Sequence, residues 1–202
     1  DDVGRDKCEN CGEDLGGPLT SLFRLQNVST RRRDRINSDE EERQRQGYEV
    51  RSAIRFSTAG GQTDRQVAVV QHDGKDLATL TYGSAATIWQ INFGWRRRQN
   101  KAEVGYVLDV ERGYWAKRQD DVADDDDDSP PVGPRTQRVV PFVEDHKNCL
   151  LFRPQFEIDD RVMASLNAAL KNAMQIQYQL EENELRCEAL PDRENRRYLL
   201  FY

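Results

Sequence analysis

The chain lacks the features that mark membrane proteins, nucleotide-driven motors and common hydrolases. No apolar run approaches the roughly 18 to 20 residues that a membrane-spanning helix needs. There is no GxxxxGK[ST] loop and no acidic pair after a strand to hold a nucleotide, and no secretory signal is visible. No Ser-His-Asp set or paired carboxylates stand out in its pattern. These gaps predict that this stretch neither hydrolyses ATP by itself nor crosses a membrane.

Cysteine is also scarce, with four in 202 residues, and their irregular spacing favours a reducing, cytoplasmic setting over a disulfide scaffold. Cys8 and Cys11 form a CxxC motif followed by Gly12, a pattern typical of a zinc knuckle. Zinc takes four ligands, and no second CxxC or HxxxH follows. The sequence therefore predicts a structural zinc site that is incomplete in this chain, with its other ligands upstream of Asp1.

Two other interpretations of the CxxC motif remain open. The thiols could be free in a loop, or the site could be completed from elsewhere in the chain. The residues available for that completion are Cys149, Cys187, His72 and His146. None of them is paired at ligand spacing, and a redox role is disfavoured because no strand precedes the motif.

The two ends of the chain indicate a piece of a longer protein. The first residue is Asp1 and not Met, and the last stretch, 198–202, is apolar with no polar tail. An apolar strand at a chain end leaves an edge and two faces that need covering. We therefore expect further sequence on both sides.

The acidic charge of the chain is concentrated in one segment. Hydrophobic residues make up 37% and charged residues 33%, and the formal net charge is −6. Seven of the acidic residues are Asp120, Asp121 and Asp124 to Asp128, and without them the net charge would be +1. Consecutive aspartates repel one another, so this run is expected to be a solvated linker, with a nearly neutral, arginine-rich remainder.

Alternation of apolar and polar residues predicts at least five strands between 48 and 117, with a hairpin turn at Asp73-Gly74. A helix capped by Asp159 or Asp160 is expected to follow, with an apolar face formed by Val162, Met163, Leu166, Ala169, Leu170, Ala173, Met174 and Tyr178. The predicted fold is α+β, an antiparallel sheet-rich first part followed by a long amphipathic helix packed on a few strands. The predicted organisation is a knuckle segment (1–20), a sheet-rich domain (21–118), an acidic linker (119–135) and a second α+β unit (136–202).

Two basic clusters are candidates for contact with nucleic-acid phosphates, because the planar guanidinium group suits phosphate. They are Arg31, Arg32, Arg33 and Arg35, and Arg96, Arg97, Arg98 and Lys101. Trp95 beside the second cluster is a candidate for stacking on a base. The alternatives are that these arginines pair with Asp34, Glu40, Glu41 and Glu42, and that Trp95 and Trp89 pack in a core.

The C-terminal part resembles the start of an MrfA-type zinc-binding (MZB) domain, which follows the motor of certain superfamily 2 DEAD/DEAH-box helicases. The resemblance rests on 164–170, Glu184-Leu185, Leu190-Pro191 and 198–202. The blocks 27–43 and 89–98 look like the region just upstream in large bacterial helicases of this kind. The family's own cysteine cluster would lie beyond Tyr202.

The resemblance implies a non-motor segment of an ATP-dependent DNA helicase or translocase acting in DNA repair or in DISARM-type anti-phage defence. ATP and Mg would then belong to the parent motor alone, and the expected partners are DNA and the rest of the helicase chain. The alternative function is an interaction module that docks a partner nuclease or subunit without contacting DNA.

Overall fold

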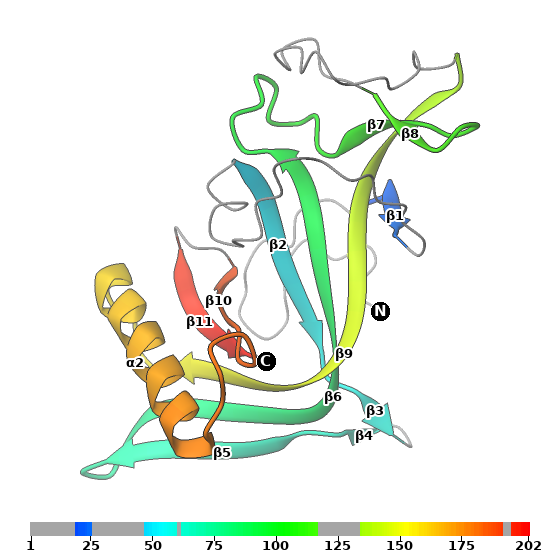
Figure 1. The fold of residues 1–202 in the computed structure, drawn as a ribbon. Coiled ribbons are helices and arrows are strands. Elements are labelled where there is room, and N and C mark those ends of the chain that lie inside the picture. The colour runs from blue at the N-terminus through cyan, green and yellow to red at the C-terminus, as the bar shows by residue number, and fades with distance from the viewer. Residues whose placement is uncertain (1–18, 26–46, 60–61, 117–133, 192–194) are drawn as a thin grey trace.

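The computed structural model describes residues 19–25, 47–59, 62–116, 134–191 and 195–202 (Figure 1). Within them the fold is α+β as predicted, with a nine-stranded, mainly antiparallel sheet and one helix packed against its C-terminal strands. The elements are β1 (Leu22–Arg24), β2 (Tyr48–Arg55), β3 (Thr58–Ala59), β4 (Gln62–Thr63), β5 (Gln66–His72), β6 (Lys75–Trp95), β7 (Tyr106–Asp109), β8 (Tyr114–Trp115), β9 (Thr136–Pro154), α2 (Asp160–Tyr178), β10 (Cys187–Pro191) and β11 (Arg196–Phe201).

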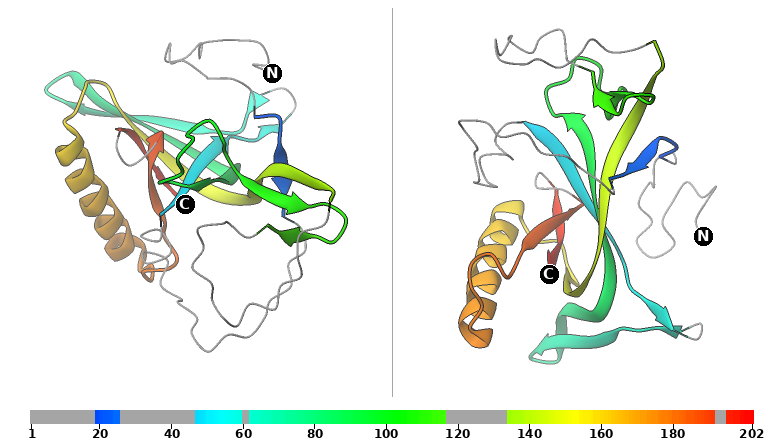
Figure 2. Two further views of the ribbon diagram at one scale, coloured as in Figure 1. Left: turned by 90° about the horizontal axis from the view of Figure 1, so that it is seen from above. Right: turned by 45° about the vertical axis from the view of Figure 1, so that its right-hand side comes forward.

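Two long strands organise the sheet. β6 has 21 residues and β9 has 19, and they pair antiparallel from Ala78↔Pro154 to Ile91↔Phe142. β5 and β2 pair in succession with β6, while β11 pairs antiparallel and β1 parallel with β9. β7 pairs with β9 just beyond the end of the β6 ladder. Figures 1 and 2 show β6 and β9 side by side along the length of the molecule.

A bulge bends the β6–β9 ladder near its middle. The register passes from Gly83↔Cys149 to Ala86↔Lys147, so two residues of β6 oppose one of β9. The segments 76–82 and 89–95, which the sequence presents as separate stretches, are therefore parts of one strand, because a bulge bends a strand without ending its pairing. A Cβ on Gly83 would lie 2.5 Å from Phe56 Cδ1, so any other residue at this bend would force the Phe56 ring to move.

The turn between β5 and β6 has the conformation that its sequence predicts. Asp73 and Gly74 both have positive φ, 49° and 73°, as a two-residue type I′ hairpin requires. This turn sets the local register, which pairs His72 with Lys75.

The helix α2 begins where predicted but buries a narrower face. Asp159 is the N-cap, and its Oδ1 accepts a hydrogen bond from Arg161 N at 2.9 Å. Met163 is fully buried against the C-terminal strands, with Leu166, Leu170 and Met174 packed around the same cluster. The prediction was wrong for four members of the expected face: Val162 and Tyr178 are 55% and 69% exposed, and Ala169 and Ala173 are exposed as well. Val162 lies about 100° around the helix from Met163, so it points away from that cluster.

Strands on both sides of the predicted linker form one sheet, because β6 pairs with β9 and β9 with β11. Side chains connect them as well. Gln90 Nε2 donates to the Tyr202 hydroxyl at 2.9 Å, and that hydroxyl donates to Glu188 Oε1 at 2.5 Å. The linker itself, and therefore the predicted domain boundary, lies largely outside the described residues. No helix in the described ranges combines the length and the apolar character that crossing a bilayer demands.

Replacing Met163 by alanine should destabilise the protein by about 2 to 5 kcal/mol, because it removes a fully buried side chain and leaves a cavity. Urea unfolding followed by circular dichroism measures this change. Val162→Ala is the matched control, since it alters the neighbouring, exposed residue and should change stability by less than about 0.5 kcal/mol. Equal losses in the two variants would contradict the described helix orientation.

Candidate functional site

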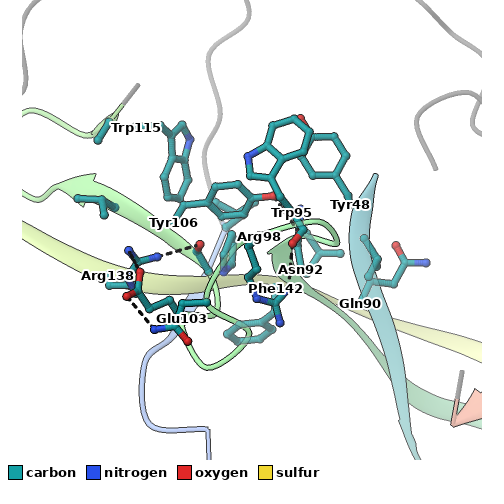
Figure 3. A pocket seen from close by; sticks show the side chains of 18 of the residues that line it. Tyr48, Gln90, Asn92, Trp95, Arg98, Glu103, Tyr106, Trp115, Arg138 and Phe142 are labelled. Atoms are coloured by element: carbon teal, nitrogen blue, oxygen red, sulfur yellow. Dashed lines mark hydrogen bonds and ion pairs between the residues drawn. The ribbon is translucent and has the colours of Figure 1, made fainter. Parts of the chain in front are cut away.

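A groove of about 1010 Å³ lies where β2, β6, β7 and β9 meet (Figure 3). Nine of its nineteen lining residues are aromatic or carry an uncharged amide, and the others are mostly aliphatic, with three charged residues, Arg98, Glu103 and Arg138. The aromatic members are Tyr48, Trp95, Tyr106, Trp115 and Phe142, and the amide members are Gln90, Asn92, Gln99 and Asn100. This composition suits a flat ring with hydrogen-bonding edges.

The aromatic side chains of the groove form two groups. The rings of Tyr48 and Trp95 are stacked, with centroids 4.4 Å apart and an interplanar angle of 27°. Trp115 makes edge contacts with Tyr106 at 5.8 Å and with Phe23 of β1 at 6.5 Å. Trp115 is itself 43% exposed, so a large part of its surface remains open to a ligand.

Asn92 links the strand to the groove wall. Its Oδ1 accepts hydrogen bonds from Gly94 N and from the Tyr106 hydroxyl, both at 3.0 Å. Burial, with a contribution from Tyr48, raises the pKa of Tyr106 to about 12, although the hydrogen bond to Asn92 opposes that rise. The phenol therefore stays protonated and remains a donor at neutral pH.

Two polar atoms of the groove are open to a ligand. Gln90 uses its Nε2 for Tyr202, and Asn92 uses its Oδ1 as described above. Asn92 Nδ2 and Gln90 Oε1 have no hydrogen-bond partner among the described residues. Both atoms are accessible to solvent, because no buried side-chain nitrogen or oxygen in the described ranges lacks a partner. The groove thus offers one amide donor and one amide acceptor, the pair that a nucleobase edge requires.

The segment 96–104 leaves the sheet and returns to it between two glycines. Gly105 N donates to Phe93 O at 2.8 Å, which closes the base of this loop. A Cβ on Gly105 would lie 2.1 Å from Val139 O, and one on Gly94 would lie 3.1 Å from Gly105 O. Both glycines also have positive φ, so the closure depends on their small size and on their backbone freedom.

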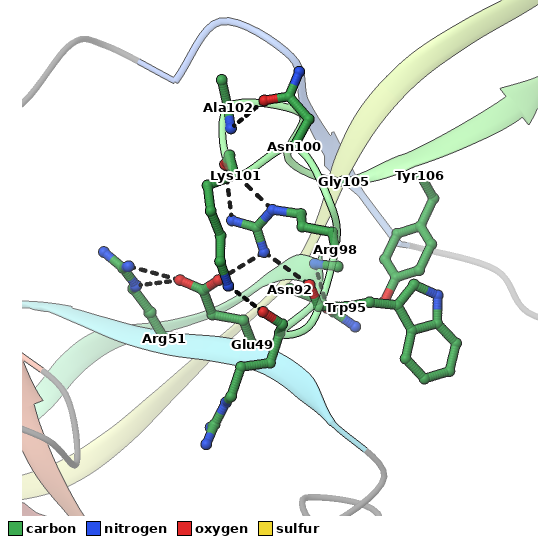
Figure 4. Close-up of polar contacts among 12 residues, drawn as sticks. Glu49, Arg51, Asn92, Trp95, Arg98, Asn100, Lys101, Ala102, Gly105 and Tyr106 are labelled. Carbon is green, nitrogen blue, oxygen red and sulfur yellow. Dashed lines mark hydrogen bonds and ion pairs between the residues drawn. The ribbon is translucent and has the colours of Figure 1, made fainter.

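Arg98 fastens this loop to β2 (Figure 4). Its Nη1 donates to Glu49 Oε2 at 2.7 Å and to Trp95 O at 3.0 Å, and its Nε and Nη2 donate to Lys101 O. The Arg98 side chain is only 13% exposed. Of the three arginines in the loop, Arg98 is therefore the one whose side chain holds the loop against β2.

Glu49 forms salt bridges with two guanidinium groups, that of Arg98 and that of Arg51, whose Nη2 lies 2.6 Å from Glu49 Oε1. Burial raises the pKa of the Glu49 carboxyl, but the hydrogen bonds and charges of Arg98 and Arg51 outweigh it and hold the pKa below its ordinary value. A second arginine, Arg138 of β9, fastens the far side of the loop. It contacts Glu103 Oε2 at 3.2 Å and donates to Gly105 O at 3.4 Å.

The structure brings one of the two predicted basic clusters to the groove. Trp95 and Arg98 line it, while Arg96 and Arg97 are exposed beside it and form no ion pair within the described ranges. Lys101 is exposed, and its Nζ donates to Arg96 O. The predicted sites Cys8, Cys11, Arg31, Arg32, Arg33 and Arg35 lie outside the described residues.

Sequence reasoning missed the other members of the groove, chiefly Asn92, Tyr106, Trp115 and Arg138. Tyr106 stands at an apolar position of a strand pattern, which predicts packing, and Asn92 stands at a polar position, which predicts solvent exposure. Arg138 is an isolated arginine. The signal that was available in the sequence is Trp115, a large aromatic residue that follows the turn glycine Gly113 by two positions.

The cysteines that the structure describes are not arranged as metal ligands. Cys149 is buried and Cys187 is half-buried, and burial raises the pKa of both thiols, that of Cys187 to about 12. Metal binding needs the thiolate form. No group of three or more His, Cys, Asp or Glu side chains in the described part of the chain could hold a metal ion. The zinc site at Cys8 and Cys11 stays a prediction.

Comparisons with protein-family models, with curated proteins and with solved structures found no match to this chain.

Acid should weaken the attachment of the loop. Because the folded-state pKa of Glu49 is lowered, its two arginine contacts contribute stability above the ordinary pKa of 4.5, and this stability is lost as the pH falls through the lower folded value. Melting temperatures from about pH 7 down to pH 3 should therefore fall less steeply below pH 4.5 in Glu49→Gln than in the parent. Glu157→Gln, which alters an exposed carboxylate without a described ion pair, is the control. Parallel curves for parent and Glu49→Gln would refute this linkage.

A methyl group at Gly105 should open the loop. Gly105→Ala combines positive φ with a clash against Val139 O, whereas Gly113→Ala combines a similar φ with open space. We expect about 1 to 2 kcal/mol of destabilisation for Gly113→Ala from the backbone alone, and a larger loss for Gly105→Ala. Thermal unfolding measures both, and equal losses would show that the close contact with β9 is unimportant.

Proposed function

We propose that this chain is a non-motor segment of an ATP-dependent DNA helicase or translocase, and that its groove holds single-stranded nucleic acid. The observation that carries the proposal is the aromatic and amide lining of the groove, with the exposed Arg96 and Arg97 beside it, which form no ion pair with a described residue. The helicase context rests on the resemblance of 89–98 and of the C-terminal part to the family named above.

The aromatic walls support binding of an unstacked base. Base–aromatic stacking contributes about 1 to 3 kcal/mol per base and works with every base, because each has a flat face. Trp115 offers such a surface, and the stacked Tyr48–Trp95 pair stands across from it (Figure 3). Bases in a duplex are already stacked on one another, so this site favours a single strand.

The amides of the groove support recognition of base edges. Asn92 is held in one orientation by Gly94 N and Tyr106, which leaves its Nδ2 as a fixed donor. Gln90 is held by Tyr202, which leaves its Oε1 as an acceptor. Preorganised donors and acceptors reduce the entropy that binding would otherwise cost.

Arg96 and Arg97 supply the positive charge that a phosphate chain needs. They follow Trp95 directly and are exposed, so we expect the backbone of a strand whose base reaches the groove to pass near them. Arg98 contributes indirectly, because its contact with Glu49 holds the loop that carries them.

The test is titration of a fluorescent oligothymidylate of about 15 nucleotides at several salt concentrations. Arg96→Ala/Arg97→Ala should flatten the slope of log K against log salt by roughly 1.4, because each phosphate contact contributes about 0.7 on a single strand. Trp115→Ala should weaken binding at every salt concentration by about 1 to 3 kcal/mol without changing the slope.

Lys75→Ala/Arg161→Ala is the matched control, since it removes two exposed positive charges from other parts of the fold and should leave the slope unchanged. A duplex of the same sequence should bind more weakly than the single strand. If Arg96→Ala/Arg97→Ala keeps the parental slope, or if the duplex binds better, the groove is not a single-strand site and the docking function becomes the better explanation.

A further inference from the structure

The strand β5 lies at the edge of the sheet, along the lower side of the molecule in Figure 1. Its hydrogen-bonded neighbour is β6, and no other strand in the described ranges pairs with it. All seven of its residues are exposed. Val67, Val69 and Val70 are 57%, 48% and 39% exposed, so apolar side chains are accessible on both faces.

This edge has none of the sequence features that usually prevent an edge strand from pairing with another chain. Such strands are usually short, bulged, or interrupted by a charged residue or a proline. Residues 66–72 contain no charged residue and no proline. The register shift in the hairpin lies between Val70 and Gln71 and places the extra residue, Leu77, on β6, so β5 itself alternates regularly.

The charges flanking β5 identify what fits this edge. Arg65 precedes the strand and Asp73 follows it, and both are exposed. When a second β5 is placed antiparallel to the first with Val69 opposite Val69, the numbers of two facing residues always sum to 138. The ladder then ends with Gln66 facing His72, and at each end Arg65 of one copy lies one residue beyond it, beside the Asp73 turn of the other.

We propose that β5 pairs antiparallel with β5 of a second copy of this chain, centred on Val69, to form a two-fold symmetric dimer with one continuous sheet. An isologous contact of this kind requires a strand complementary to itself, and the Arg65–Asp73 arrangement supplies that. The main-chain groups of the free edge provide the hydrogen bonds, and in this register Val69 faces Val69 while Val70 faces Ala68 across the interface. Asp73 lies 3.3 Å from His72 within its own chain, and its side chain is 85% exposed, so it remains accessible to a second copy.

The dimer is tested by sedimentation velocity of the 202-residue chain between about 1 and 200 μM, without nucleic acid. The parent should shift from monomer to dimer across this range. Val69→Lys should weaken association at least about tenfold, since it brings two ammonium groups together at the centre of the interface. Val110→Lys, which charges an equally exposed valine outside β5, should associate as the parent does.

A charge rescue tests the register. Arg65→Glu lies beside Asp73 at both ends and should weaken association roughly 5- to 10-fold. Arg65→Glu/Asp73→Asn should recover part of that loss, because asparagine removes the repulsion and keeps the positive φ of the turn. Melting temperatures of all variants confirm that each is folded.

A parent that remains monomeric at every concentration overturns the proposal. So does association that survives Val69→Lys, which would place the contact elsewhere on the chain. Dimerisation that Val69→Lys abolishes but that responds neither to Arg65→Glu nor to its rescue would overturn the Val69-centred register. These outcomes do not depend on the groove, since nucleic acid is absent from the measurement.

Discussion

The pairing of β6 with β9 is the constraint on which the rest of the molecule depends. Every other strand of the nine-stranded sheet pairs with one of these two or with a neighbour that does. Leu199 and Leu200 of β11 are fully buried where that strand adds to β9, and α2 covers the same end. At the opposite end the ladder stops near Ile91 and Phe142, and β7 takes up the pairing with β9. The groove forms at this change of partner, where aromatic side chains from several strands gather around space that no strand fills.

The loop 96–104 is fixed from two sides by salt bridges of unequal burial. Arg98 and Glu49 are 13% and 17% exposed, whereas Arg138 and Glu103 are 42% and 58% exposed. The first pair is therefore little screened by solvent and positions the loop, while the second adds little by itself. Holding the loop in this way leaves Arg96 and Arg97 exposed next to Trp95, and neither forms an ion pair with another residue that the structure describes.

Local patterns predicted the parts of the fold that local forces decide. The strand at 48–55, the Asp73-Gly74 turn and the cap at Asp159 each depend on residues a few positions apart, and all were confirmed. The alternating burial expected within that strand was not, since Val50 is 49% exposed. The continuous strand through Gly83 was not predicted, because a glycine between two apolar runs is equally typical of a turn. The groove could not be predicted either. Nothing distinguishes Arg98 from Arg96 and Arg97 until Glu49, 49 residues away in sequence, is placed beside it. The assignments at Cys8, Cys11 and the first arginine cluster rest on sequence alone.

The parallel pairing of β1 with β9 has a consequence for the order in which the chain assembles. Leu22 lies beside Val140, a contact between residues more than a hundred positions apart, whereas His72 and Lys75 meet across a two-residue turn. Closing a long chain segment costs more entropy than closing a short one, and contacts between distant residues slow folding. We therefore expect the β5–β6 hairpin to form early and β1 to dock late. Phe23 of β1 packs against Trp115, so the aromatic wall of the groove is complete only once the long-range contacts have closed.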